Sequence, residues 1–444
     1  MTASDLCRQT VHFSRKSHET NSHRPHVVGE FLHKHRNELG LAAAIVFVTA
    51  VTAVFSDAYH SGEGRIEVAR IIFRDTAMLG IFALGAAIVI IAGGIDLSSG
   101  SLIAFSGTVF FGMLILLAPD DPTTRWAGDP ERHFPDTENL SLWIPAAALL
   151  VTLGVAFLVG SFHAWLITVI ELPPFVATLA SLVGLRSLAR LLIQDVTAIE
   201  YGQRQSTITI NDELLTSISR EGWWVSCVVW VVLSAALWLL LSRTVVGRHL
   251  YAMGGNEEAA RLSGIRTDRL KWLAYCISSM TAALAGILYA CYIGTTSPAT
   301  DGMGYELNAI AAAVVGGCSL AGGIGTIAGV MLGAMFLRVV IDSVAKLFRS
   351  QPDLFEGVVV GMLVVLAVAF NSLRGRGGLK KQFFPGTLGL LNVLILSGLA
   401  GVMTSVTSQD DKLRYGLLVG LSTLVILGGK AVAERIASRR GEAA

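Results

Sequence analysis

Two glycine-rich segments, 93–101 and 316–325, interrupt apolar sequence with polar side chains. The first reads Gly-Gly-Ile-Asp-Leu-Ser-Ser-Gly-Ser and the second Gly-Gly-Cys-Ser-Leu-Ala-Gly-Gly-Ile-Gly. Glycine clusters lower helix stability, and irregular backbone at membrane depth is tolerated only where protein or a water-filled cavity satisfies it. Exposed carbonyl, amide and hydroxyl groups are partners for a neutral polar solute. The candidates for the wall of a translocation path are therefore Gly93, Gly94, Asp96, Ser98, Gly316, Gly317, Ser319, Gly322 and Gly323.

Structural roles compete with that interpretation. Asp96 can cap the helix that follows it, as Ser98 or Ser99 can, and we favour a structural role for Asp96, a turn with an N-cap, because a path for a neutral solute needs no charge. The segment 316–325 can form a broken helix that faces 93–101 across a polar cleft. It can equally serve close packing between helices through small residues.

A third segment, 243–271, is polar and lies between two long apolar segments. Asn256 is a good helix N-cap, Glu257 and Glu258 suit the first turn, and Gly264 can end the helix in a left-handed turn. A short capped helix outside the lipid has little reason to exist unless a partner docks on it. The predicted docking segment consists of Gly254, Gly255, Asn256, Glu257, Glu258, Ala259, Ala260, Arg261 and Gly264.

No catalytic constellation accompanies these segments. The sequence lacks Gly-x-x-x-x-Gly-Lys-Ser/Thr, since Gly428-Gly429-Lys430 is followed by Ala431 without the upstream glycine, so we expect the chain not to bind ATP itself. His-Glu-x-x-His and Gly-x-Ser-x-Gly are also absent, and the cysteines show no Cys-x-x-Cys spacing. We therefore predict no enzymatic activity, no metal site and no cofactor bound by this chain.

The elements that must position these segments are membrane helices. The sequence is 53% hydrophobic and 15% charged, with mean hydropathy +0.61, which is typical of a polytopic membrane protein. Its net charge of +1 gives no reason to expect a nucleic-acid partner. Because a transmembrane helix needs about 20 mostly apolar residues, we predict an all-α membrane bundle of about 10 core helices plus two extra C-terminal spans. The predicted spans lie near 39–55, 76–94, 101–118, 143–169, 173–193, 222–241, 271–293, 306–319, 324–345, 355–371, 387–407 and 415–433.

The basic residues predict the orientation. The stretches 1–38, 242–270, 372–386 and 434–444 are richer in Lys and Arg than the alternate loops, which places them and both termini in the cytoplasm by the positive-inside rule. The predicted organisation is then a disordered cytoplasmic tail (1–38), a transmembrane domain (39–372), a cytoplasmic linker (373–386) and two additional helices with a basic tail (387–444).

A few charged residues fall inside the predicted spans. Glu306 could pair with a basic group, and Arg190 can snorkel to the interface, whereas the role of Arg186 stays open. Asp342 and Lys346 have the i, i+4 spacing of a local ion pair.

Segments 93–101, 173–179, 254–265, 304–312 and 315–325 together resemble the ribose/xylose-type ABC transporter permeases, in family order over roughly residues 65–372. The resemblance implies a permease subunit of an importer in the bacterial inner membrane. An ATP-binding cassette ATPase on another chain would bind the docking segment, and an extracytoplasmic sugar-binding protein would deliver a monosaccharide. A second permease subunit, identical or different, would complete the path.

Two other functions stay open. The same machine could carry another small solute such as a branched-chain amino acid, but an amino acid would need a paired acid and base in the cleft. The sequence offers few candidates for such a pair, which favours a sugar. An ion-coupled carrier or channel would work without an ATPase and would depend on buried ionisable groups, which the sequence makes sparse.

Overall fold

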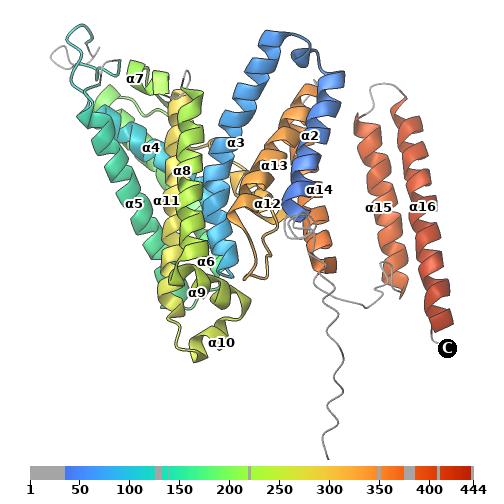
Figure 1. Ribbon diagram of the computed structural model, residues 1–444. Helices are drawn as coiled ribbons and strands as arrows, with labels where there is room; N and C mark the ends of the chain where they lie inside the picture. The colour runs from blue at the N-terminus through green and yellow to red at the C-terminus, as the bar shows by residue number, and fades with distance from the viewer. Residues whose placement is uncertain are drawn as a thin grey trace, which may run out of the picture. The chain divides into compact units, whose positions relative to one another are not determined.

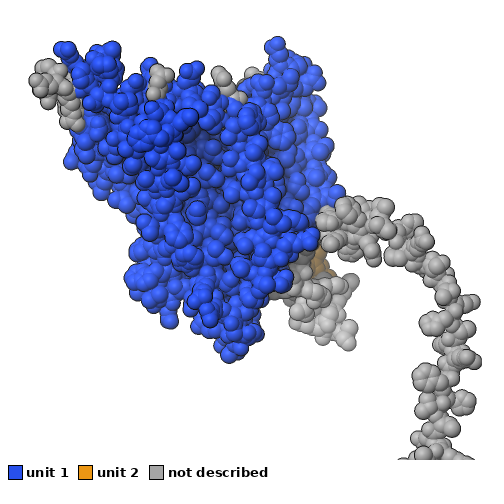
Figure 2. Space-filling view, turned by 60° about the vertical axis from the view of Figure 1, so that its left-hand side comes forward, with its two compact units in different colours: residues 1–371 blue, residues 372–444 orange. Residues whose placement is uncertain are grey.

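The computed structural model describes residues 36–125, 133–138, 140–218, 222–347, 352–374, 386–407 and 411–441. Nearly all of the predicted N-terminal tail and most of the predicted linker lie outside these residues. The chain divides into two compact units, unit 1 (residues 1–371) and unit 2 (residues 372–444), which Figure 2 colours blue and orange.

The described residues form a helical protein (Figure 1). The long helices of unit 1 are α2 (Arg36–Phe55), α3 (Gly62–Ile91), α4 (Ser99–Leu117), α5 (Trp143–Thr168), α6 (Pro174–Tyr201), α8 (Trp223–Arg243), α11 (Thr267–Ile293), α13 (Ile327–Leu347) and α14 (Pro352–Arg374). Shorter helices are η1 (Asp57–Tyr59), α7 (Glu213–Thr216), α9 (Val245–Gly255), α10 (Glu257–Leu262) and α12 (Tyr305–Val315). Two short strands, β1 (Ile208–Thr209) and β2 (Thr295–Thr296), pair antiparallel, with Ile208 opposite Thr296.

Within the described part of the chain, nine helices are long and apolar enough to cross a membrane. Shorter apolar helices, at Tyr305–Val315, Phe355–Leu366 and Gly389–Ser405, occupy three further predicted spans. The predicted all-α polytopic membrane bundle is therefore confirmed.

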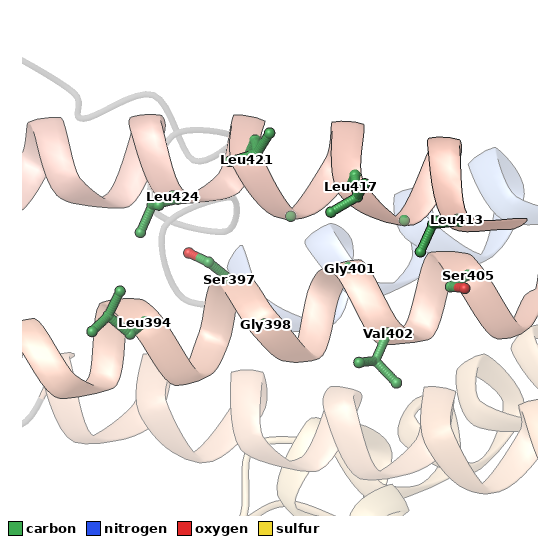
Figure 3. A pocket seen from close by; sticks show the side chains of 12 residues that line it. Leu394, Ser397, Gly398, Gly401, Val402, Ser405, Leu413, Leu417, Leu421 and Leu424 are labelled. Atoms are coloured by element: carbon green, nitrogen blue, oxygen red, sulfur yellow. The ribbon is translucent and has the colours of Figure 1, made fainter.

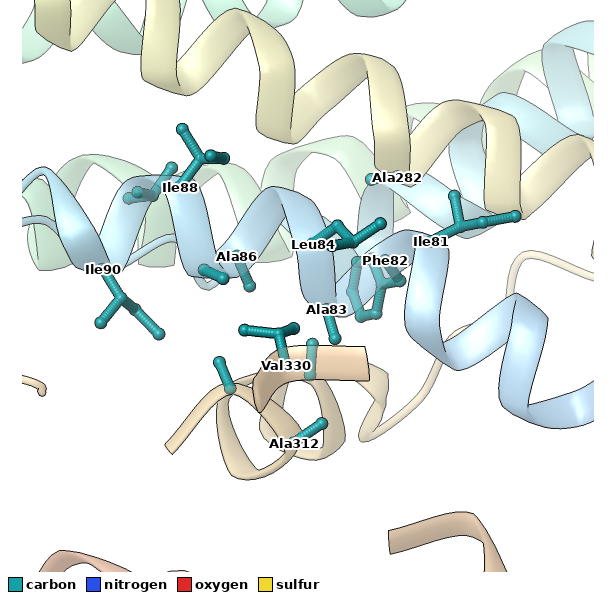
Figure 4. Close-up of a cluster of buried hydrophobic side chains, with 14 of the residues drawn as sticks. Ile81, Phe82, Ala83, Leu84, Ala86, Ile88, Ile90, Ala282, Ala312 and Val330 are labelled. Atoms are coloured by element: carbon teal, nitrogen blue, oxygen red, sulfur yellow. The ribbon is translucent and has the colours of Figure 1, made fainter. Parts of the chain in front are cut away.

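Helix α3 is the centre of unit 1. In its apolar stretch 94% of the residues are buried, against 11% in α2. Figure 4 shows Ile81, Phe82 and Leu84 of α3 beside Ala282 of α11 and Ala312 of α12. Alanines on the neighbouring helices let the backbones approach closely, so α3 is held on several sides by packing.

The start of α3 differs from the prediction, which placed a span at 76–94 and an outer loop at 56–75. The helix begins at Gly62, where the Ser61 hydroxyl caps it by accepting from Gly64 N at 3.0 Å. The first turns carry Glu63, Arg65 and Glu67, so a hydropathy criterion rejects them although they are helical. Arg74 and Asp75 consequently lie inside a long helix rather than in a loop.

Both predicted helix breaks are confirmed. α3 ends at Ile91 and α4 begins at Ser99, while α12 ends at Val315 and α13 begins at Ile327. Gly93, Gly317, Gly322 and Gly323 have φ between 71° and 97°, a left-handed conformation that glycine adopts without steric cost.

Unit 2 consists of α15 (Gly386–Thr407) and α16 (Lys412–Gly441). The helices approach through glycines, because a Cβ on Gly401 would lie 2.8 Å from the Gly416 carbonyl oxygen. A cavity of about 370 Å³ between them is lined mainly by leucines and glycines, including Leu394, Leu417 and Gly401 (Figure 3). The sequence predicted these two helices as additional spans.

Candidate functional site

The predicted docking segment folds into α9 and α10, at the same end of unit 1 as the turn that follows α3 (Figure 1). The Asn256 side-chain oxygen accepts from Ala259 N at 2.9 Å, and Gly264 has φ +82°. Glu257 accepts from Lys271 Nζ at 2.6 Å and pairs with Arg261 at 3.3 Å. The predicted cap and left-handed end of this helix are therefore confirmed.

Only part of α10 is available to a partner. Glu258, Ala259 and Arg261 are exposed, but Ala260 is 5% exposed and belongs to the hydrophobic core. Leu262 is 85% exposed, and sequence reasoning did not include it in the docking segment. A leucine so exposed on a helix at the end of the bundle is a better marker of a contact surface than Ala260.

Two glycine-containing turns meet the end of α9, and we call this contact the glycine joint, formed by Gly93, Gly254, Gly322 and Gly323. Gly323 N donates to the Ile91 carbonyl at 3.0 Å. A Cβ on Gly254 would lie 1.8 Å from the Ile91 carbonyl oxygen and 2.6 Å from Gly323 N. A Cβ on Gly322 would lie 2.4 Å from the Gly254 carbonyl oxygen. The three segments therefore touch backbone to backbone, with no room for a Cβ at Gly254, Gly322 or Gly323.

The glycine joint bears on the two alternatives left open for 316–325, a broken helix that faces 93–101 across a polar cleft or close packing through small residues. The two segments are in direct contact through the end of α9, as the alternative of small-residue packing supposed. Gly316 likewise packs against Gly329, whose carbonyl oxygen would be 2.4 Å from an added Cβ. Ser319 stays within its own turn, where its amide donates to the Ile324 carbonyl at 3.0 Å.

The path and docking segments nevertheless share one cavity. It has a volume of about 280 Å³, and its lining includes Gly93, Gly94, Asn256, Glu257 and Lys271. Residues chosen separately from the sequence as path and as docking candidates are thus brought together in space.

Asp96 has a structural role in the turn, although it does not cap α4, whose N-cap residue is Ser98 without a side-chain capping bond. It is 2% exposed. Its Oδ1 accepts from Ser98 N at 2.9 Å and from Ser98 Oγ at 2.6 Å, and its Oδ2 accepts from Ser278 Oγ at 2.7 Å. These bonds fix the turn before α4 and tie it to α11, because a buried carboxylate must be hydrogen-bonded.

The structure shows the contacts of most of the charged residues that fall inside the predicted spans. Arg186 Nη1 donates to the carbonyls of Pro298 at 2.9 Å and Asp301 at 3.0 Å, so it holds the connection between α11 and α12. Asp342 and Lys346 form the predicted pair, and Arg190 is exposed. Glu306 Oε2 has no hydrogen-bond partner among the described residues.

The Asp301 carboxylate lies in that connection. Burial raises its pKa above the ordinary value of 3.8, and the hydrogen bond from Ser297 N, at 2.7 Å, opposes the shift.

A second polar site, which we call the polar cavity, lies among α3, α11, α12, α13 and α14. Its volume is about 140 Å³, and its lining is Arg74, Asp75, Met78, Leu79, Tyr289, Tyr292, Tyr305, Asn308, Arg338, Ile341 and Glu356. Asp75 Oδ1 accepts from Arg74 at 2.9 Å, and its Oδ2 pairs with Arg338. The Arg74 guanidinium lies 3.8 Å from the centre of the Tyr292 ring.

Sequence reasoning missed the polar cavity. It placed Arg74 and Asp75 in an outer loop, and it judged buried acid–base pairs to be few. The available signal was Arg338 within the apolar run 324–345, because an arginine inside a membrane helix requires a partner.

The amino-acid sequence is similar to those of known membrane transport proteins. A family model described as the permease component of branched-chain amino acid transport systems matches residues 69–368. The chain is 28% identical to the ribose import permease protein RbsC of Haemophilus influenzae, over 78% of this chain and 96% of that protein. It is 35% identical to the autoinducer 2 import system permease protein LsrC of Enterobacter sp. strain 638, over 79% of this chain and 93% of that protein. No solved structure matches it.

Proposed function

This chain belongs to the family of ABC transporter permease components, and on that premise we propose that it is the membrane subunit of a sugar importer driven by an ATPase on another chain. The observation that carries the proposal is α10, a capped helix with an exposed leucine that leads through α9 to the glycine joint. A force applied to α10 would reach α3 and the 316–325 turn directly, because no flexible side chain lies between their backbones.

The orientation follows from the same proposal. α10, the glycine joint and both termini face the cytoplasm of the bacterial inner membrane, where the basic loops favour them. The opposite ends of the helices face the extracytoplasmic sugar-binding protein. A second permease subunit, identical or different, completes the path, and Gly93 and Gly94, which line the cavity beside the docking segment, belong to the part of it nearest the ATPase.

A monosaccharide is the favoured solute because the similar permeases are named for ribose and for autoinducer 2. A branched-chain amino acid is the second candidate, favoured by the description of the matching family model. The ligand of the purified cognate binding protein, measured by calorimetry, separates the two. A binding protein selective for leucine or valine would replace the sugar with an amino acid.

The docking role is tested with Leu262→Asp. The exposed leucine should contribute to the ATPase interface, so a charge there should abolish co-purification with the ATPase and ATP-dependent uptake into proteoliposomes. The fold should be preserved, because Leu262 is 85% exposed.

Leu142→Asp is the matched control. Leu142 is 73% exposed before α5, at the opposite end of the bundle, and its replacement should leave the ATPase bound. If Leu262→Asp retains both the ATPase and uptake, α10 is not the docking helix. If the wild-type chain alone moves solute into sealed vesicles, the protein is a carrier or channel instead.

A further inference from the structure

We propose that the polar cavity is a binding site for the transported solute inside the permease, and that it accepts a neutral, polyhydroxylated molecule of monosaccharide size. This inference rests on the proposed function and adds to it a location and a chemical selectivity. The cavity is lined by residues of five helices of unit 1 and is separate from the glycine joint.

Packing alone does not account for the charges in the cavity. The side chains of Arg74, Asp75 and Arg338 are only 12%, 17% and 26% exposed. Desolvating such groups costs free energy that ion pairing often fails to recover, and ionisable residues within membrane helices usually mark a solute pathway. A functional reason for this cluster is therefore required.

The charges balance within the cavity. Two guanidinium groups, of Arg74 and Arg338, stand with two carboxylates, of Asp75 and Glu356. Both oxygens of Asp75 are already engaged, one by each guanidinium. A single ion would upset this balance. A zwitterionic amino acid would add two further charges to a cavity whose charges already balance, so an uncharged solute fits better.

The remaining groups suit hydroxyls and sugar rings. Arg338 Nε has no hydrogen-bond partner among the described residues and can donate to a hydroxyl oxygen. The Asn308 amide both donates and accepts, as a hydroxyl pair requires. Tyr289 and Tyr305 present rings 5.9 Å apart at 67°, and aromatic faces pack well against the C–H face of a sugar.

The volume limits the solute to a small molecule. The cavity measures about 140 Å³, well below the roughly 300–1,000 Å³ of pockets that hold drug-sized ligands. A single monosaccharide is therefore the largest class of solute that we assign to it.

The cavity is also connected to the docking end. α3 runs without interruption from Arg74 to Ile91, a distance of about 26 Å at 1.5 Å per residue. α12 runs from Tyr305, in the cavity, to the turn at Gly316. Both helices thus link the cavity to the glycine joint, so a bound solute and the ATPase act on the same two elements.

The test is equilibrium binding of radiolabelled D-ribose, D-xylose, D-glucose and D-galactose to the full-length permease in nanodiscs, without binding protein. We expect saturable binding of at least one sugar that L-leucine does not displace. Asn308→Ala should weaken it at least tenfold, because the amide lines the cavity and the ion pairs of Asp75 do not depend on it. Asn211→Ala, which removes an exposed amide before α7, is the matched control and should bind like the wild type.

Three results would overturn the inference: no sugar of the panel binds, L-leucine displaces the sugar, or Asn308→Ala binds as the wild type does. Tyr305→Phe, which keeps the ring, should bind better than Tyr305→Leu, which loses it. Co-purification with the ATPase is measured on the same preparations. A normal complex with an unchanged Asn308→Ala affinity refutes the cavity alone, whereas loss of the wild-type complex refutes the proposed function.

Discussion

The two halves of α3 make different kinds of contact, through backbone atoms at one end and through charged side chains at the other. Around Ile91 the helix ends against other backbones, and the contacts are made by glycines and by one hydrogen bond from Gly323 N. Around Arg74 and Asp75 it carries long charged side chains that meet aromatic rings and a cavity. One half is suited to transmitting movement and the other to recognising a solute.

This difference implies different tolerance to substitution. Backbone contacts leave no space for a Cβ at Gly254, Gly322 or Gly323, so these positions can change only at the expense of folding. Side chains that line a cavity can be exchanged while the helix stays in place, as long as their charges remain matched. Solute preference can therefore vary among similar proteins without alteration of the docking end.

The largest effect is expected from Gly254→Ala. The added Cβ would lie 1.8 Å from the Ile91 carbonyl oxygen, and backbone neighbours cannot move aside as a side chain can. Overpacking typically costs about 1–3 kcal/mol, and we expect a loss of unfolding free energy of about 3 kcal/mol or more. Thermal unfolding of the purified protein in detergent measures it.

Gly255→Ala is the matched control for this substitution. Gly255 is the next residue in α9, and a Cβ there would meet nothing within 4 Å. The thermal stability of the Gly255→Ala variant should equal or slightly exceed that of the wild type. Equal stability of the two alanine variants would mean that the close contact at Gly254 does not exist and that the comparison fails at this end.

The second prediction concerns the other half of α3. Asp75→Asn removes the carboxylate that compensates Arg74 and Arg338, and uncompensated buried charge is strongly destabilising. Because these side chains are partly exposed, we expect a loss of about 2–3 kcal/mol, below the 3–5 kcal/mol of fully buried pairs. Thermal or denaturant unfolding measures the loss, together with weaker sugar binding.

Glu67→Gln on the same helix is the control for Asp75→Asn. Glu67 pairs with Arg70 at 3.7 Å, and their side chains are 62% and 53% exposed. Exposed pairs contribute about 0–1 kcal/mol, so the variant should be nearly as stable as the wild type. If both variants lose the same amount, the charges of the polar cavity are no more important than surface charges.

Local features were predictable because their causes lie within a few residues. Asn256 and Gly264 could be assigned as cap and turn from spacing alone, and both helix breaks followed from their glycines. The long-range features could not be predicted in this way. Nothing in the local sequence of Gly93 specifies that Gly254 will contact it, because that contact depends on how the helices pack. Arg74 and Asp75 were misplaced because a hydropathy window stops where charge begins, although the helix continues.

The surface of α10 illustrates the same limit. Helix periodicity in a six-residue element cannot decide which side faces the core, so Ala260 was assigned to the docking surface and Leu262 was not. Only the packing of α10 against its neighbours shows that Ala260 is buried and Leu262 exposed. Candidate residues on short helices need a structure before they are used in mutagenesis.

The smallest effect is expected at Asp301, in the connection that leads from Tyr289 on α11 to Tyr305 on α12. Burial raises the pKa of its carboxyl above the ordinary 3.8, so the folded state holds this proton more tightly than the unfolded state does. The associated stability is present below 3.8 and is lost as the pH rises from 3.8 through the raised pKa. Asp301→Asn cannot ionise, so its thermal stability should depend less on pH in that range and should slightly exceed the wild type at neutral pH.

Asp121 supplies a control of opposite sign, because hydrogen bonds from Thr123 lower the pKa of its exposed carboxyl. The stability that the ionised Asp121 carboxylate contributes is present above pH 3.8 and is lost as the pH falls through the lowered pKa. Asp121→Asn should therefore lose less thermal stability than the wild type at acid pH. Thermal unfolding measured across the acid range distinguishes the two variants. If Asp301→Asn and Asp121→Asn both reduce the loss of thermal stability at acid pH, burial does not raise the pKa of Asp301. The ionised Asp301 carboxylate would then not destabilise the connection beside the polar cavity.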